Sequence, residues 1–160
     1  MHRSIQGTGF KIGIVWQGNP KFGDDQFRSI PLRCFEPLAR VEGVKLVSLQ
    51  QGPGTEQLPE FQKRYPIVDL NYRLKTFNDT AAVMMNLDLI VSSCTSVPHL
   101  AGALGLPVWT VLQKSADWRW LLGREDSPWY PTMRLFRQTT FGAWDEVFER
   151  IASAARALLV

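Results

Sequence analysis

The chain has 160 residues, 45% of them hydrophobic and 21% charged, and its 18 basic and 15 acidic residues leave a net charge of +3. This length suits one domain that buries a core without a disulfide or a metal. The composition excludes a disordered or low-complexity chain, and the small, dispersed positive charge argues against a nucleic-acid binder.

The start of the chain gives no targeting signal. Residues 1–9 are polar and lack the apolar core of a signal peptide, so we interpret them as a disordered lead-in. No stretch approaches the roughly 20 apolar residues that span a bilayer. The two cysteines, Cys34 and Cys94, have no metal-binding or redox spacing. We therefore expect a cytoplasmic protein with no membrane span and no metal.

The first half of the chain alternates predicted strands and helices. A β-branched run over 11–16 stops at a polar turn, which is typical of a strand buried on both faces. A helix over 32–40 follows, with Pro31 in its first turn. The remaining predicted elements are a strand over 44–49, a glycine-rich loop over 50–54, a weak helix over 56–64 and a strand over 67–70.

The second half continues the alternation. Asn78 or Asp79 is the expected cap of a helix that runs to residue 86. Gly105 and Pro107 stop a later helix. The expected elements are strands over 87–92, 108–112 and 133–137, a helix over 97–104 and a closing amphipathic helix over 144–159. The pattern predicts an α/β fold with a Rossmann-like, doubly wound parallel sheet of about six strands.

The residues after the fourth predicted strand suit an anion. In open α/β sheets, ligands bind beyond the carboxyl ends of the strands, where the strand order reverses. Thr95 or Ser96 caps the helix there, and Pro98 lies in its first turn. The free N–H groups, two hydroxyls and positive dipole end are the parts of an anion site. Either these residues hold a phosphate, or they only cap the helix.

The loop after the first predicted strand is expected to face Thr95 across this crevice. Gly18 lets backbone approach a ligand, while Lys21 and Arg28 carry charges that neutralise phosphate. The alternative is an ordinary solvated loop. On the facing helix we interpret His99 as a hydrogen-bonded side chain rather than an acid or base. We interpret Cys94 as a small buried sulfur rather than a nucleophile.

A nicotinamide cofactor is disfavoured, because no G-x-G-x-x-G follows the first strand, and no P-loop pattern occurs. We expect no cofactor. A tryptophan-rich segment over 117–131 either stacks on a base or sugar, or covers the edge of the sheet. We interpret Trp120 as structural and leave both roles open for Trp118.

Three blocks of the sequence resemble the nucleotide-sugar-binding half of GT-B glycosyltransferases. The resemblance is nearest to ADP-heptose:lipopolysaccharide heptosyltransferases and their relatives fused to tetratricopeptide repeats. The blocks are 13–20 with 28–31, then 95–105, then 117–131 with 133–138.

This resemblance implies that residues 1–160 form a single Rossmann-like domain, the C-terminal, donor-binding half of a GT-B fold. It implies a diphosphate site and no metal. The expected ligand-binding residues are Gly18, Asn19, Lys21, Arg28, Gln50, Thr95, Ser96, His99 and Trp118.

The chain departs from the family at two positions. Family members usually carry Asp at the position of Cys94 and often Gly at the position of Ser96. An acidic residue there orders the turn or touches the donor, so its loss bears on catalysis. We assign no catalytic residue, since 160 residues cannot also hold an acceptor half and its general base.

The expected function is the donor-binding half of a metal-independent glycosyltransferase that takes a nucleotide-diphosphate sugar. Its expected partner is an N-terminal acceptor domain or tetratricopeptide repeats. One alternative is a catalytically degenerate nucleotide-binding or protein-interaction module from a tetratricopeptide-repeat protein. Another is a different Rossmann-like nucleotide binder, because a fold alone does not fix function.

Overall fold

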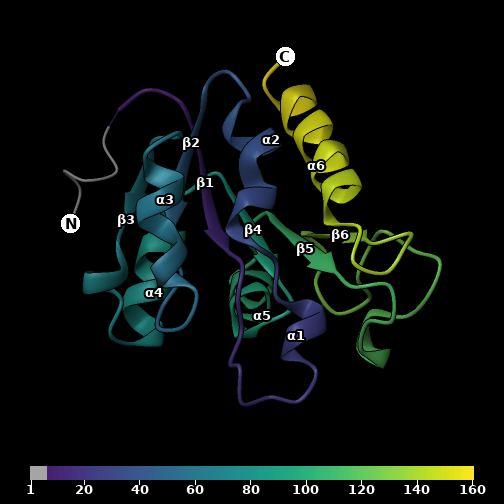
Figure 1. Cartoon of the computed structure of the whole chain (residues 1–160). Coiled ribbons are helices and arrows are strands. Elements are labelled where there is room, and N and C mark those ends of the chain that lie inside the picture. Colours follow the sequence, from purple (N-terminus) through teal and green to yellow (C-terminus); the bar gives the residue numbers. More distant parts are fainter. Residues whose placement is uncertain (1–6) are drawn as a thin grey trace.

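Six parallel strands form one sheet in residues 7–160, the part of the chain that a computed structural model describes (Figure 1). Their order is β3-β2-β1-β4-β5-β6. The strands are β1 Phe10–Val15, β2 Val44–Ser48, β3 Ile67–Asp69, β4 Leu89–Ser93, β5 Val108–Leu112 and β6 Met133–Arg137. The predicted doubly wound sheet is confirmed. The lead-in expected over 1–9 lies outside the described residues as far as residue 6, and residues 7–9 run into β1.

The strand order reverses at the centre of the sheet. β1 pairs with β2 on one side and with β4 on the other, so the chain crosses the sheet between β3 and β4. β4 and β5 are buried along their whole length, because their apolar sequences are covered on both faces. The reversal therefore brings the loops after β1 and β4 side by side at the carboxyl edge.

Helices cover both faces of this sheet (Figure 1). One face packs against a core that includes Phe35, Leu38, Phe61 and Phe148, and the other against Met84 and Ala101. The α-helices are α1 Asp25–Arg28, α2 Glu36–Ala39, α3 Leu58–Gln62, α4 Phe77–Met84, α5 Ser96–Ala103 and α6 Trp144–Leu158. No helix in residues 7–160 combines the length and the apolar character needed to cross a membrane.

The structure corrects several predicted boundaries. The helix expected over 32–40 is a 3-10 turn, Leu32–Phe35, followed by α2, whose first turn contains Pro37. The predicted caps Asn78 and Asp79 are wrong. Thr76 caps α4, and the Asp79 side chain bonds back to the Thr76 backbone, which completes a capping box. Helix α1 and a 3-10 turn at Trp118–Trp120 were not predicted.

Candidate functional site

A cleft of about 690 Å³ opens at the reversal of the strand order. We call it the first cleft. The loops after β1, β2 and β4 line it, together with the starts of α4 and α5 and one residue from the loop after β5. It brings together these predicted site residues: Gly18, Asn19, Arg28, Gln50, Thr95, Ser96 and His99.

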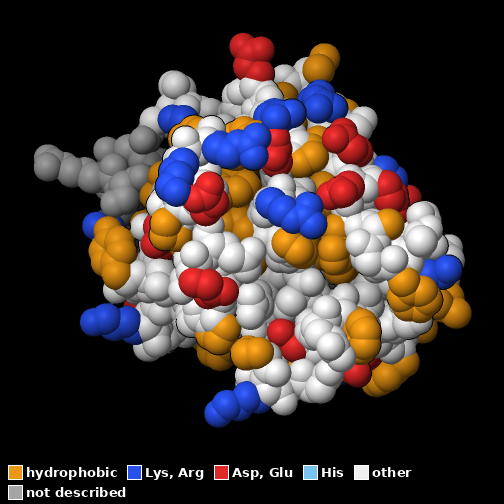
Figure 2. All heavy atoms as spheres, viewed as in Figure 1, with side chains coloured by type: hydrophobic (Ala, Val, Ile, Leu, Met, Phe, Trp, Pro, Cys, Tyr) orange, Lys and Arg blue, Asp and Glu red, His pale blue; other side chains and the backbone are white. Residues whose placement is uncertain are grey.

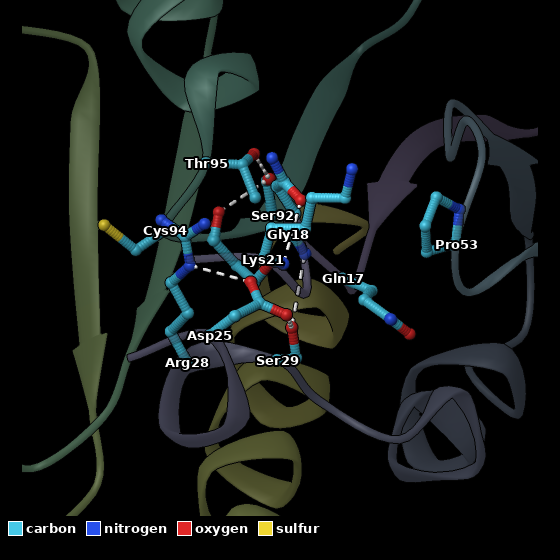
Figure 3. Close-up of polar contacts among 12 residues, drawn as sticks. Gln17, Gly18, Lys21, Asp25, Arg28, Ser29, Pro53, Ser92, Cys94 and Thr95 are labelled. Atoms are coloured by element: carbon cyan, nitrogen blue, oxygen red, sulfur yellow. Dashed lines mark hydrogen bonds and ion pairs between the residues drawn. The ribbon is translucent and has the colours of Figure 1, made fainter. Parts of the chain in front are cut away.

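Arg28 is held at the first cleft by a buried acid (Figure 3). Its Nε donates to Asp25 Oδ1 at 3.0 Å, and Asp25 is 4% exposed. The other carboxylate oxygen, Asp25 Oδ2, accepts from Ser29 Oγ at 2.9 Å. Among the described residues, neither terminal nitrogen of Arg28 has a hydrogen-bonding partner. The guanidinium is therefore fixed in place and keeps donors for a ligand.

Gly18 passes directly beside this ion pair. Its N–H donates to Ser29 Oγ at 3.2 Å. A Cβ on Gly18 would lie 2.4 Å from Asp25 Oδ1 and 2.5 Å from Arg28 Nη2. A side chain at this position would therefore displace the ends of the Asp25 and Arg28 side chains.

The start of α5 forms the opposite wall. Thr95 Oγ1 accepts from the N–H of Val97 at 3.3 Å, so Thr95 is the N-cap, as one of the two interpretations of the sequence predicted. The Ser96 side chain is exposed, and Pro98 is buried in the first turn. The positive end of the helix dipole thus faces the first cleft, although the cap uses the Val97 N–H and Pro98 has none.

Gln50 shapes the floor of the cleft. Its Oε1 accepts from the N–H groups of Trp16 and Gln17, both at 3.0 Å. Its Nε2 donates to the carbonyl oxygens of Gln17 and Pro53, both at 2.9 Å. The amide is used up by backbone partners, so it joins the loops after β1 and β2 rather than reaching toward a ligand.

His99 and Cys94 pack around Trp120. The Trp120 ring is fully buried, which confirms its structural interpretation, and it stacks on His99 with centroids 5.1 Å apart. His99 Nδ1 lies 3.0 Å from Tyr130 Oη, and Trp120 Nε1 donates to Cys94 Sγ at 3.2 Å. The prediction of a buried sulfur is corrected: Cys94 is only half-buried and lines the first cleft.

Both side chains stay uncharged near neutral pH. Burial, with the nearby Arg119 charge, lowers the pKa of His99. Burial raises the pKa of the Cys94 thiol. A protonated thiol argues against nucleophilic catalysis by Cys94, and Nδ1 of His99 is already paired with Tyr130.

Two basic residues at the site were not predicted. Lys75, before α4, and Arg119, in the loop after β5, line the first cleft with Arg28. The lining residues that are described include no Asp or Glu. Arg28 pairs with Asp25 and Arg119 lies 3.3 Å from Asp117, so among the described residues Lys75 is the cation of this group without an ion pair. The remaining N–H donors of these three side chains favour an anionic ligand. The sequence did offer a hint for Arg119, because this residue lies between Trp118 and Trp120 in the tryptophan-rich segment that was considered for ligand contact.

Lys21 and Trp118 do not line the first cleft. The Lys21 backbone N–H donates to Asn19 Oδ1 at 3.0 Å, while its side chain is exposed. Trp118 is 74% exposed. In residues 7–160, no group of three or more His, Cys, Asp or Glu side chains has the arrangement of a metal site.

Comparison with known proteins identifies the fold. No family model matches the chain. Over 157 residues the chain is 29% identical to Protein FlbA of Caulobacter vibrioides, covering 94% of this chain and 26% of FlbA. The chain thus spans about a quarter of the length of that relative.

Two similar solved structures are E. coli enzymes. ADP-heptose lps heptosyltransferase II matches with a TM-score of 0.67 and 19% identity, covering 96% of this chain and 47% of the enzyme. Heptosyltransferase WaaC with ADP matches with a TM-score of 0.58 and 15% identity, covering 95% of this chain and 44% of the enzyme. The chain has the fold of one half of a GT-B heptosyltransferase, as the resemblance implied.

Proposed function

We propose that this chain is the donor-binding half of a metal-independent glycosyltransferase, and that the first cleft holds the diphosphate of a nucleotide-diphosphate sugar. The observation that carries the proposal is the group of three basic residues that line the cleft. Arg28, Lys75 and Arg119 lie at the point of the sheet where α/β proteins bind ligands. Asp25 and Asp117, which pair with the two arginines, are not part of the described lining.

The geometry suits a leaving diphosphate. Such a group gains negative charge as the sugar departs, and donors fixed in advance lower the barrier more than mobile ones. Asp25 fixes the Arg28 guanidinium, and Thr95 sets the start of α5. Arginine donates to two phosphate oxygens at once, and the N–H at the start of α5 donates to a third.

The base of the donor is suggested by the similar enzymes. WaaC was solved with ADP and with ADP-2-deoxy-2-fluoro heptose. An adenosine diphosphate sugar is therefore the first donor to test. We place the acceptor site and the general base on another domain, an N-terminal acceptor half or a region of tetratricopeptide repeats.

A second candidate function is a nucleotide-binding or protein-interaction module without catalysis. Cys94 favours it, because a neutral thiol stands where the resembling family carries a carboxylate. Nucleotide binding without sugar transfer by the full-length protein would support this alternative.

The proposal is tested by calorimetry with ADP, UDP and GDP on the chain and its Arg28→Ala variant. Loss of a hydrogen bond to a charged group is worth about 1.5–3 kcal/mol. We expect ADP to bind and Arg28→Ala to weaken it by about 10-fold or more. Arg33→Ala is the matched control, because Arg33 is exposed and lies outside the first cleft. Equal affinities of the two variants, or no binding of any diphosphate, would contradict the proposal.

A further inference from the structure

Arg119 reaches the first cleft from the tryptophan-rich segment, residues 117–131, between β5 and β6. Among the described residues of that segment, it alone lines the cleft. Exposed hydrophobic side chains gather over the loops that follow β5 and β6, at the lower right of Figure 2. Trp118 and Trp129 in this segment are 74% and 57% exposed. Packing in the core explains Trp120, but it does not explain these two rings.

The indole N–H of Trp129 bonds directly to the backbone of Arg119. Trp129 Nε1 donates to the Arg119 carbonyl oxygen at 2.9 Å, across ten residues of the chain. Trp118 lies against Arg119 in a different way, with its ring centroid 5.9 Å from the guanidinium carbon. Trp129 therefore fixes the peptide group that follows Arg119, whereas Trp118 lies beside the end of the Arg119 side chain.

The residues on either side of Arg119 are also held. Asp117 Oδ1 accepts from the Arg119 N–H at 3.1 Å and lies 3.3 Å from Arg119 Nε. Trp120 is fully buried and stacks on His99. The N–H of Arg119 is thus bonded within the segment, and its carbonyl oxygen is bonded by Trp129. Both polar groups of the Arg119 backbone have partners.

The residue that ends this short turn has a strained backbone. Leu121 has a φ of 55°, and within residues 7–160 it is the one residue other than glycine with a positive φ. Such a conformation persists where the surrounding structure holds it. Arg137 Nη2, at the end of β6, donates to the Leu121 carbonyl oxygen at 2.6 Å. The path of the chain near Arg119 is therefore set by bonds from outside the turn.

We propose that Trp129 is a positioning residue, which fixes the Arg119 carbonyl and thereby directs the Arg119 guanidinium into the first cleft. This role explains the exposed ring, because the indole N–H points to the backbone while the rest of the ring stays in solvent. A guanidinium that is fixed before a ligand binds loses less conformational entropy on binding. The inference rests on the proposed diphosphate site, because it assigns no ligand of its own.

The first test compares Trp129→Phe with Trp118→Phe by calorimetry with ADP. Trp129→Phe removes the N–H donor and keeps a ring. Trp118→Phe is the matched control, because it removes an indole N–H from the same segment and keeps a ring beside the Arg119 guanidinium. We expect Trp129→Phe to weaken ADP binding at least threefold, the effect of about one hydrogen bond, and Trp118→Phe to bind ADP like the parent chain. Equal affinities of the two variants would overturn the proposal.

A double-mutant cycle separates positioning from a general loss of structure. Trp129→Phe should not weaken ADP binding further in an Arg119→Ala chain, because the side chain that it positions is gone. In an Arg28→Ala chain it should keep its full effect, because Arg28 lies on a different loop. Equal weakening by Trp129→Phe with and without the Arg119 side chain would overturn the proposal.

NMR without nucleotide tests the inference independently of the proposed function. We expect Trp129→Phe to move the Arg119 Nε–H signal of the isotope-labelled chain toward the signals of freely exposed arginines, and Trp118→Phe to move it less. If the parent chain does not bind ADP, the diphosphate site is contradicted, and the Arg119 signal alone decides whether Trp129 positions this side chain. An Arg119 signal that Trp129→Phe leaves unchanged overturns the inference, whether or not ADP binds.

Discussion

At Gly18 the backbone of the loop after β1 passes within contact distance of the Asp25–Arg28 ion pair. The same loop contains Gly23, where a Cβ would meet nothing within 4 Å. A side chain at Gly18 would displace the ion pair, whereas a side chain at Gly23 would meet open space. We therefore infer that Gly18 shapes the site and that Gly23 does not.

We predict that Gly18→Ala pushes the Arg28 guanidinium out of place and weakens ADP binding at least fivefold, because a Cβ cannot share space with the ion pair. Calorimetry measures the affinity, and thermal unfolding reports the fold. Gly23→Ala in the same loop is the control and should bind ADP like the parent chain. If the two variants bind equally well, Gly18 has no part in shaping the site.

Single residues were predicted where the signal was local. The Thr95 cap and the structural role of Trp120 followed from position and size, and both are confirmed. The partial exposure of Cys94 was missed, because the sulfur is set between Trp120 from a distant loop and the first cleft. Gln50 was expected at the site. That its side-chain amide forms hydrogen bonds with backbone groups of two loops could be learned only from the structure.

At the scale of elements, helix α4 shows why caps are hard to predict. Asn and Asp are among the residue types most often found at the N-cap, so residue type alone predicts Asn78 or Asp79 as the cap. In the structure Asp79 is the reciprocal partner at the third helical position, and Thr76 is the cap. The bond from Thr76 lowers the pKa of the Asp79 carboxyl. The boundary matters for the site, because Lys75 and Thr76 line the first cleft.

We predict that Thr76→Ala lowers the free energy of unfolding by about 1 kcal/mol, the usual cost of losing a threonine cap. Asn78→Ala should change it by much less, because Asn78 is exposed and makes no capping bond. Urea unfolding measures both. If Asn78→Ala lowered the free energy of unfolding more than Thr76→Ala, Asn78 rather than Thr76 would be the cap.

That capping contribution also has a predicted pH dependence. Because the folded-state pKa of Asp79 is lowered, its part of the stability is present above the unfolded-state pKa of about 4 and disappears as the pH falls through the folded value. The difference in unfolding free energy between the parent chain and Thr76→Ala should therefore shrink in acid. A difference that grows as the pH falls would contradict this assignment.

For the whole molecule, topology was the most predictable level. Strands that alternate with helices over short connections leave few arrangements for a parallel sheet, and the order reversal then fixes where ligands bind. The first cleft itself was less predictable. Lys75 and Arg119 reach it from loops after different strands, and the sequence alone does not show that these loops meet.

A crystal structure of the chain with ADP is the sharpest test of the proposed diphosphate site. We predict the diphosphate in the first cleft, with phosphate oxygens within hydrogen-bond distance of the Arg28 guanidinium and of the Ser96 N–H at the start of α5. A diphosphate bound outside the first cleft, or a first cleft without nucleotide in crystals grown at saturating ADP, would contradict it.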